Sequence, residues 1–401
     1  MQHNGDGSST GKYTATKLRS VYYGQDSIKQ LHTVLEDIMP KDADHKILII
    51  TGKSLAKTPV IPEVEDILKQ KNAYACTFAK MRQHTPIDDI EEALDIVHKE
   101  GITVLLGVGG GSPIDACKTL SYFHNERYGT FIPHIAIPTT LSAAEFTQLA
   151  GHTNREGHKT GVFAEEICPS AIIFDPRLAQ YTPEKLWLST GIRALDHALE
   201  TLYRPGAQYP IQQLALIAIR DLFTYLPLCK NSGGKDLEAI QRLQVAAWMS
   251  LFPAKLETAL GPSHGLGHDL GATYSIPHGT CSVLTLASTI RQMAKTLPPG
   301  SPRSMLANTF SYLPTSFVRD HVRRHESGDS DISACLATAD AVDKLVEILE
   351  LKTTLSDFNV PREDLPKLAK TTYEATVGKP GWKGICPSEE QILRGILEPI
   401  F

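Results

Sequence analysis

Short apolar runs alternate with amphipathic stretches through the first half of the chain. The apolar runs are rich in β-branched residues and bounded by glycine or charge, as buried parallel strands are. They span residues 46–51, 102–108, 134–138 and 171–174. Helical periodicity covers 61–70 and 87–100, and Thr85-Pro86 precedes the second stretch as a predicted cap and first-turn proline. This alternation predicts a parallel sheet with helices on both faces.

The second half of the chain has a different pattern. Long amphipathic segments dominate from about residue 182, and they include 190–203, 210–226 and 236–251. No further run has the character of a strand, which predicts a helical domain. We therefore expect three parts along the chain. They are a disordered polar N-terminus over 1–18, an α/β domain over 19–181 and a helical domain over 182–401.

Composition and charge narrow the classes of protein. The chain of 401 residues has 42% hydrophobic and 21% charged residues, which is typical of a globular protein. A formal charge of -5, with basic residues scattered, gives no footprint for nucleic acid or an anionic membrane. No window approaches the roughly 20 apolar residues of a membrane span, and the N-terminus lacks the apolar stretch of a signal peptide. The seven cysteines are spread singly, so we expect reduced thiols in a cytoplasmic protein.

The first candidate for chemistry is Gly109-Gly110-Gly111-Ser112, which follows the strand at 102–108 and precedes a helix. Small residues let backbone N–H groups approach an anionic diphosphate, and the helix N-terminus adds partial positive charge. Ser112 is expected to cap the helix or to bond a phosphate oxygen. The alternative is a turn that only reverses the chain. The run differs from the GxGxxG of the usual dinucleotide fold, so a different topology is expected.

Four histidines form the second candidate. His264 and His268 are four residues apart, so on a helix they share one face. His278 follows in a turn-like stretch, and His197 lies on the predicted helix over 190–203. Neutral imidazole is the commonest transition-metal ligand, so this set offers three metal ligands and a proton donor. The alternative is that some of these histidines cap helices or bond buried carbonyls.

The chain resembles the iron-containing (group III) alcohol dehydrogenase family from about Tyr22 to the last helices. Gly109 to Ser112, with Asp115 and Lys118 following, resembles the family's phosphate loop. Ile137-Pro138-Thr139-Thr140 resembles the segment that passes along the nicotinamide. The run from His264 to His268, ten residues before His278, resembles its second metal-site motif.

The resemblance implies a fold and a set of contacts. The fold is the dehydroquinate synthase-like one, with an N-terminal dinucleotide-binding α/β domain, a helical C-terminal domain and an active site in the cleft. The resemblance also implies cofactor contacts from Thr139, Thr140, Ser142 and Lys159, a small carbonyl or alcohol substrate, and a homodimer. His197, His264 and His278 fall on positions that hold Fe²⁺ or Zn²⁺.

One residue departs from the family pattern. The family's helix motif has an aspartate four residues before the histidine ligand, and in this sequence Arg193 stands four residues before His197. An arginine stays protonated and cannot coordinate a cation, so metal binding is in doubt. Asp196 sits one residue before His197 and points about 100 degrees away on a helix, which makes it a poor substitute.

Part of the chain is similar to the maleylacetate reductases, a neighbouring branch that also lacks a complete metal set. The similar segments are 139–147, 157–161, and 194–197 followed by 200–203, whereas 264–279 is more like the alcohol dehydrogenases. The expected activity is therefore hydride transfer between a nicotinamide cofactor and a carbonyl compound, in the reductive direction. Maleylacetate reduction proper, a lyase or synthase on the same scaffold, and a non-catalytic descendant that binds NADP stay open.

The choice of cofactor depends on the strand at 46–51. NAD-preferring relatives often carry an aspartate just after this strand, where it would repel a 2'-phosphate. This chain has Gly52, followed by Lys53, Ser54 and then Lys57. A glycine leaves room and nearby cations favour an extra phosphate, so we expect NADPH to be preferred over NADH. The alternative is that the lysines are only solvated loop charges.

A mechanism follows as a hypothesis. A carbonyl that accepts hydride develops negative charge on oxygen, which a site must stabilise while it delivers a proton. We expect Arg193 to supply positive charge in place of the cation, or to clamp a substrate carboxylate. His268, or another member of the set, would give the proton. Arg193 should also lower the pKa values of the imidazoles and keep them neutral near pH 7.

Overall fold

The computed structural model describes residues 12–38, 45–254, 260–322, 325 and 328–401. The chain folds into two compact units. The α/β unit comprises residues 15–183 together with 234–244, and the helical unit comprises the described residues of 12–14, 184–233 and 245–401. Within the described part of the chain, no helix is long and apolar enough to cross a membrane.

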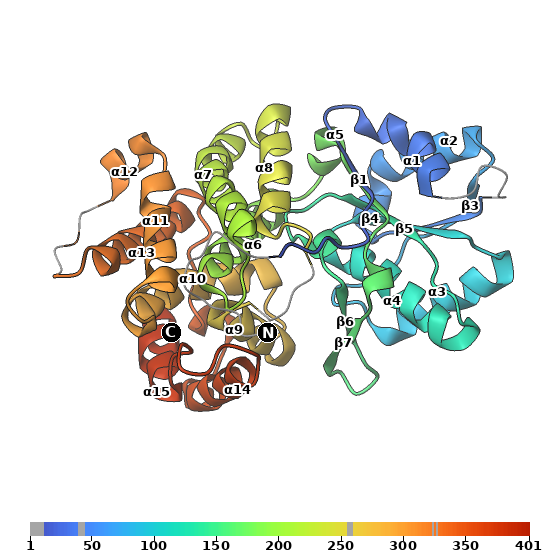
Figure 1. Ribbon diagram of the computed structural model, residues 1–401. Coiled ribbons are helices and arrows are strands. Elements are labelled where there is room, and N and C mark those ends of the chain that lie inside the picture. Colours follow the sequence, from blue (N-terminus) through green and yellow to red (C-terminus); the bar gives the residue numbers. More distant parts are fainter. Residues whose placement is uncertain (1–11, 39–44, 255–259, 323–324, 326–327) are drawn as a thin grey trace. The chain divides into compact units, whose positions relative to one another are not determined.

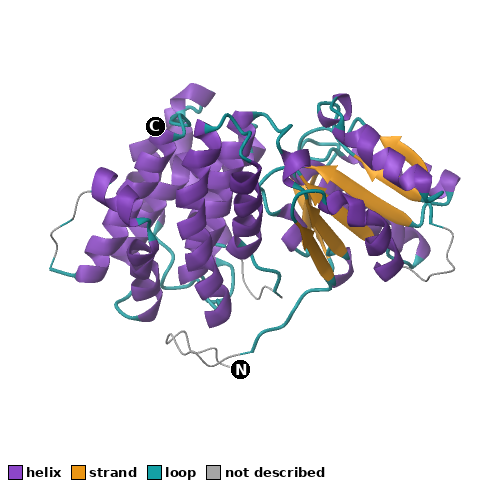
Figure 2. Cartoon of the chain, turned by 90° about the horizontal axis from the view of Figure 1, so that it is seen from above, coloured by secondary structure: helices purple, strands orange, loops and turns teal. Residues whose placement is uncertain are grey.

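The α/β unit is built on a six-stranded parallel sheet (Figure 2). Its strands are β1 (Ser20–Tyr23), β2 (Ile47–Ile50), β3 (Tyr74–Phe78), β4 (Val104–Gly109), β5 (His134–Pro138) and β8 (Ala171–Phe174). They lie in the order β1-β8-β5-β4-β2-β3. A separate antiparallel hairpin pairs β6 (Leu149–Thr153) with β7 (Lys159–Phe163).

Helices cover both faces of this sheet. They are α1 (Leu31–Ile38), α2 (Val60–Gln70), α3 (Ile87–Glu100), α4 (Gly111–Tyr128) and α5 (Pro176–Ala179). Ile47 and Ile49 pack with apolar residues of α1 and α2, whereas Leu48 and Ile50 pack with those of α3 and α4. Because successive side chains of a strand point to opposite faces, four consecutive apolar residues are what a sheet with two covered faces requires.

The strand order places a switch point between β2 and β4. From β2 the chain moves outward to β3, and then returns to the other side of β2 for β4, β5 and β8. In open parallel sheets, ligands bind outside the carboxyl ends of the strands at such a point. The carboxyl ends of β2, β4 and β5 carry the three sequence segments predicted to hold the cofactor.

The helical unit contains the remaining helices, which the second half of the chain forms in sequence (Figure 1). They are α6 (Glu184–Tyr203), α7 (Tyr209–Asn231), α8 (Leu237–Ser250), α9 (Pro262–Thr273), α10 (His278–Thr296), α11 (Ser301–Tyr312), α12 (Thr315–His321), α13 (Ser330–Ile348), α14 (Leu365–Val377) and α15 (Glu389–Ile392). Residues 237–244 of α8 group with the α/β unit. Every residue of α6 from Trp187 to Tyr203 is buried.

The predicted fold class is confirmed, with differences in detail. The four predicted strands are β2, β4, β5 and β8, and the described residues after 182 contain no strand. The sequence pattern missed β1, β3 and the β6–β7 hairpin. Thr85 is not the cap of α3, because Pro86 holds that position and the Thr85 hydroxyl donates to the Ser112 carbonyl instead.

The predicted disordered N-terminus lies partly outside the described residues. Residues 1–11 are not described, whereas Tyr13 donates a hydrogen bond to the Pro253 carbonyl and Lys17 pairs with Glu166 at 2.6 Å. The compact units divide between Pro183 and Glu184, beside the predicted boundary at 181 and 182. The boundary and the disorder stay predictions.

Candidate active site

The glycine loop at the end of β4 packs against the segment that follows β5. Gly109 has a φ of 142°, a conformation that favours glycine, and α4 begins at Gly111. A Cβ atom added to Gly110 would lie 3.1 Å from Cγ2 of Thr140, and one added to Gly111 would lie 3.4 Å from Oγ of Ser142. The structure therefore brings these five predicted cofactor residues together.

The loop has the properties that a diphosphate requires. It leaves bare backbone at the N-terminus of α4, an 18-residue helix with no acidic residue in its first turn. Backbone N–H groups and the partial positive charge of such a helix end attract an anion. A Cβ atom at Gly110 would crowd Thr140, at 3.1 Å from its Cγ2 atom, so glycine keeps the backbone of this loop open. The residues present therefore fit the diphosphate of a nicotinamide dinucleotide.

Ser112 has a role that the sequence did not predict. Gly110 occupies the cap position of α4, so Ser112 is not the cap. Its hydroxyl oxygen accepts a hydrogen bond from the backbone N–H of His84 at 3.2 Å. His84 and Thr85 both have positive φ, at 64° and 51°. The Thr153 side chain of β6 donates to the His84 carbonyl, so the hairpin and the glycine loop together hold this strained turn.

The predicted contacts after β2 and β5 lie at the same edge of the sheet. Gly52 is half-buried after β2, and Lys53 and Ser54 are exposed. The adjoining Leu55 would lie 3.8 Å from a Cβ atom at Gly109, which places this turn beside the glycine loop. Thr139 is buried, and its backbone N–H donates to the Gly109 carbonyl at 2.8 Å.

Asp115, Lys118 and Lys159 lie around the hairpin. Lys118 is fully buried, and its ammonium donates to Oγ1 of Thr147 at 2.9 Å and to the Leu149 carbonyl at 3.0 Å. Asp115 lies 4.0 Å from that ammonium, and burial raises its pKa to about 6. Lys159 lies on β7 close enough to His84 to lower its pKa, which burial and then Lys159 bring to about 4. Lys118 thus anchors the hairpin, and the charge of Lys159 acts on the strained turn.

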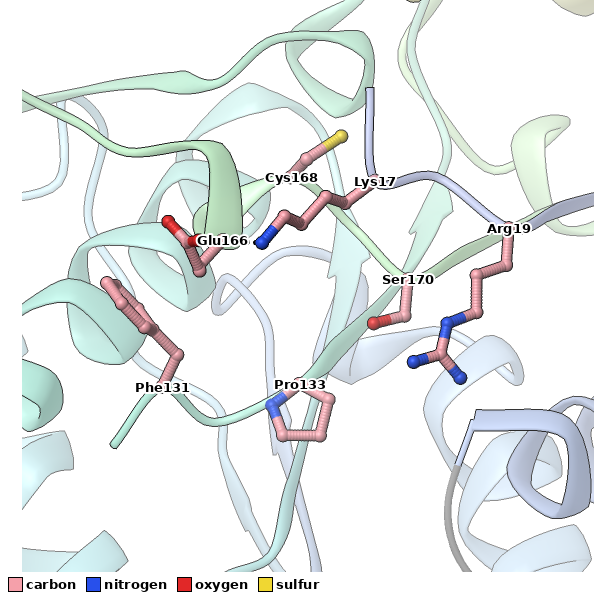
Figure 3. A pocket seen from close by; sticks show the side chains of 7 residues that line it. All are labelled: Lys17, Arg19, Phe131, Pro133, Glu166, Cys168 and Ser170. Atoms are coloured by element: carbon pink, nitrogen blue, oxygen red, sulfur yellow. Dashed lines mark hydrogen bonds and ion pairs between the residues drawn. The ribbon is translucent and has the colours of Figure 1, made fainter. Parts of the chain in front are cut away.

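A separate cavity of about 390 Å³ lies at the opposite edge of this sheet. Arg19, Pro133 and Ser170 line it, and each directly precedes a strand, so the cavity is at the amino ends. Figure 3 shows Lys17 reaching toward Glu166 across it. None of the predicted cofactor residues lines this cavity.

In the helical unit, the four predicted histidines form a continuous row of rings. Centroid distances are 5.4 Å from His197 to His264, 4.9 Å from His264 to His268, and 5.7 Å from His268 to His278. His197 projects from α6, His264 and His268 project from α9, and His278 begins α10. His268 is exposed, whereas His197 is buried. The structure therefore brings this predicted set together as an imidazole cluster.

Glu200 holds the N-terminus of α9, and with it two of the histidines, against α6. The Glu200 side chain is fully buried, and its oxygens accept hydrogen bonds from the backbone N–H groups of Gly261 at 2.8 Å and Ser263 at 2.9 Å. The Tyr203 hydroxyl donates to the same carboxyl group at 3.2 Å. A carboxylate at a helix N-terminus satisfies backbone donors that would otherwise be unpaired.

Arg193 lies beside the imidazole cluster at 5% exposure. Its Nη2 donates to Nε2 of His264 at 3.1 Å, and its Nη1 donates to Oγ of Ser282 at 3.2 Å. Ser282 in turn donates to Oδ2 of Asp196 at 2.6 Å, and Nη1 lies 3.5 Å from that oxygen. A Cβ atom at Gly267 would approach Nη1 to 3.2 Å, so the glycine leaves room for the guanidinium.

The pKa values of His197 and His264 are both lowered, which is the predicted direction. Burial, and then the charge of Arg193, hold the pKa values of His197 and His264 well below the usual histidine value. Burial is the larger cause, which the sequence did not reveal. Both rings are therefore neutral near pH 7.

The residues at this position do not fit a divalent cation. Among the described residues, no group of three or more His, Cys, Asp or Glu side chains is arranged to hold a metal. The Nε2 lone pair of His264, one of the two ring nitrogens that could bind a metal, accepts a hydrogen bond from Arg193. Asp196 accepts from Ser282 and faces Arg193, so it is a counter-ion of the guanidinium.

Three interactions at these sites were not predicted from the sequence. Ser282 stands four residues after His278 on one helix, and that spacing could have indicated it. The Arg193–Asp196 pair is separated by three residues, a spacing that also brings side chains together on a helix. No sequence signal marked His84, because its positive φ arises from tertiary contacts.

The chain combines an α/β unit with a helical unit, and comparison with known proteins identifies its family. Residues 19–176 match the family model described as iron-containing alcohol dehydrogenase. Residues 187–395 match the model of the C-terminal part of the Fe-containing alcohol dehydrogenase family. The chain therefore belongs to the iron-containing alcohol dehydrogenase family, and the resemblance and enzyme class predicted from its motifs are confirmed.

Individual relatives differ in their activities. The chain is 26% identical to the NAD-dependent methanol dehydrogenase of Bacillus methanolicus, over 88% of this chain and 91% of that protein. It is 29% identical to the maleylacetate reductase of Pseudomonas sp. (strain P51), over 55% of this chain and 60% of that protein. The solved maleylacetate reductase from Agrobacterium tumefaciens has a TM-score of 0.77 at 20% identity, with 98% of each chain covered.

Proposed function

We propose that this chain reduces a carbonyl compound to an alcohol with a nicotinamide cofactor, and that it prefers NADPH. The single observation that carries the proposal is the edge where β2, β4 and β5 end. There Gly110 packs on Thr140 and Gly111 on Ser142, and the exposed Lys53 follows the adjacent strand. The relatives named as methanol dehydrogenase and maleylacetate reductase support the same reaction class.

The chain's residues have distinct roles in this proposal. A bound reduced nicotinamide supplies the hydride for the carbonyl carbon. The glycine loop and the N-terminus of α4 would hold the diphosphate, and Lys53 and Ser54 would bind the 2'-phosphate. Arg193 stabilises the negative charge that develops on the carbonyl oxygen. The exposed imidazole of His268 donates the proton that completes the alcohol.

A screen of carbonyl compounds tests the proposal. NADPH oxidation is followed with aldehydes, ketones and keto acids, and kcat/KM is compared for NADPH and NADH. We expect turnover with net NADPH consumption and a higher kcat/KM for NADPH. Turnover without net consumption of cofactor would indicate a lyase or synthase, and NADPH binding without turnover would indicate a non-catalytic protein. A clear preference for NADH would refute the role of Lys53.

Maleylacetate reduction is a second candidate. It is favoured by the absence of an aspartate at residue 193 and by the relative of that name in Pseudomonas. A carboxylated ketone is therefore the first substrate to assay. A kcat/KM for the carboxylated ketone no higher than that for its uncharged counterpart would exclude this candidate.

A further inference from the structure

In the family pattern, the imidazole cluster and an aspartate hold a metal ion. In this chain the cluster has other neighbours. Two of the nearest side chains, Arg193 and Asp196, come from one helix, and Ser282 comes from α10. The arginine and aspartate form a buried ion pair with a 3.5 Å separation, and Ser282 bridges them with two hydrogen bonds. A buried cation normally requires such a partner, because desolvation of an unpaired charge costs several kcal/mol.

The hydrogen bond to His264 fixes what that imidazole can do. A guanidinium has only donors, so Arg193 must be the donor and Nε2 of His264 must be the unprotonated nitrogen. The proton of this neutral ring is therefore on Nδ1. A metal ion at Nε2 would have to break this bond, and it would lie beside a fixed positive charge that repels it.

We propose that the Arg193 guanidinium permanently takes the place of the divalent cation, so that this chain binds no metal at the imidazole cluster. The positive charge of the guanidinium is balanced by the carboxylate of Asp196. Ser282 links the two groups by hydrogen bonds. Gly267 makes room for this guanidinium. A Cβ atom at this position would lie only 3.2 Å from Nη1 of Arg193.

The orientation of the guanidinium indicates which oxygen it serves. Nη1 is directed to Ser282 and Asp196, whereas Nη2 is the nitrogen that lies at the imidazoles. A substrate carboxylate held end-on by both nitrogens would compete with Asp196 for Nη1. The arrangement therefore favours a single acceptor on Nη2, which is the reacting carbonyl oxygen. This last step rests on the proposed function, whereas the absence of a metal does not.

Metal analysis of the whole protein tests the proposal without any assay of turnover. The wild-type chain is purified without added metal, incubated with Zn²⁺ or anaerobically with Fe²⁺, desalted, and analysed by mass spectrometry for bound metal. We expect far less than one equivalent per chain, and no change in Tm on addition of Zn²⁺ or EDTA. One retained equivalent, or saturable binding of one Zn²⁺, would overturn the proposal.

One substitution should create the metal site. Arg193→Asp restores an aspartate four residues before His197 and frees Nε2 of His264. We expect this variant to retain about one Zn²⁺ per chain, with a Tm rise on the order of 5 °C at saturating metal. The matched control is the double variant Arg193→Asp/His264→Asn, which should lose both effects. A folded Arg193→Asp chain that binds no metal, or a double variant that binds as well, would refute the role given to Arg193. If Arg193→Asp does not fold, the wild-type measurement decides alone.

Kinetics test the oxygen assignment. Arg193→Met should lower kcat on the order of 10³-fold, and Arg193→Lys should restore part of the loss because it keeps a donating cation. We expect the same fractional loss for a carboxylated ketone and for its uncharged counterpart. A loss confined to the carboxylated ketone would show a carboxylate clamp and contradict the assignment. Failure of every substrate would defeat the proposed function and leave the metal analysis standing.

Discussion

The carboxyl edge of the α/β sheet and the imidazole cluster of the helical unit use different chemical groups. The edge is made mainly of backbone, with Gly109 to Gly111 presenting bare N–H groups at a helix end. The cluster is made of side chains, and its chemistry depends on the identity of Arg193, His264 and Asp196. A backbone site keeps its function through much sequence change, whereas one substitution can replace the chemistry of a side-chain site. The chain keeps the predicted glycine loop, whereas Arg193 stands where the family pattern has an aspartate.

The largest expected effect comes from a substitution in the glycine loop, which tests the backbone site. Gly110→Val puts a branched side chain where a single Cβ atom already lies 3.1 Å from Thr140, so it crowds the loop. We expect NADPH affinity to fall by more than about 10³-fold, because the lost N–H contacts are charge-assisted. Isothermal titration calorimetry measures this. The same substitution at Gly328, where an added Cβ atom meets nothing within 4 Å, should leave affinity unchanged. Equal affinities in both variants would remove the loop from the cofactor site.

A second variant tests the side-chain site while sparing the backbone site. His268→Asn removes the exposed imidazole and with it the proposed proton donor. We expect kcat to fall roughly 10²- to 10⁴-fold with NADPH affinity unchanged, since general acid catalysis contributes that much. His98→Asn, on an exposed histidine of α3, is the control and should have wild-type kcat. An unchanged kcat in His268→Asn would assign the proton to another group.

Cofactor preference depends on a side chain at the backbone site. Lys53→Glu places a negative charge where the 2'-phosphate is expected. We expect the ratio of kcat/KM for NADPH to that for NADH to fall about 10- to 100-fold, which is the value of one or two charge-assisted hydrogen bonds. Lys71→Glu, on an exposed residue after α2, serves as the control. A ratio that Lys53→Glu does not move would mean that Lys53 is a solvated loop charge.

The last effect concerns the stability of the fold beside the glycine loop rather than activity. Glu145 is fully buried, and burial raises its pKa to about 7 from 4.5. The native state therefore binds more protons than the unfolded state between these pH values, and it loses stability as the pH rises through this window. Between pH 5 and pH 8 the wild type should lose up to about 3 kcal/mol more than Glu145→Gln, which does not titrate. Urea unfolding of both proteins at the two pH values measures this, and parallel losses would contradict it.

How much could be predicted from the sequence follows from the same contrast. Strands β2, β4, β5 and β8 are buried on both faces, so each is a continuous apolar run. β3 is an edge strand and half-buried along most of its length, and Tyr23 at the end of the edge strand β1 is 62% exposed. Edge strands have no such run to reveal them.

The candidate sites divide in the same way. The glycine loop was predictable because bare backbone requires a residue type, and the imidazole cluster was predictable because its spacings are helical. The bond from His84 to Ser112 joins residues 28 apart, and the bond from Ser282 to Asp196 joins residues 86 apart. Such contacts are set by tertiary packing, which leaves no periodic trace in the chain.

The ion pair between Arg193 and Asp196 also bears on how uniform a population of molecules can be. A metal site has an occupancy, which varies with supply, with competing metals and with chelators. The guanidinium of Arg193 is part of the polypeptide, so every folded molecule carries one. If Arg193 replaces the cation as proposed, a preparation of this protein holds no metal-free inactive fraction and no wrongly metallated one.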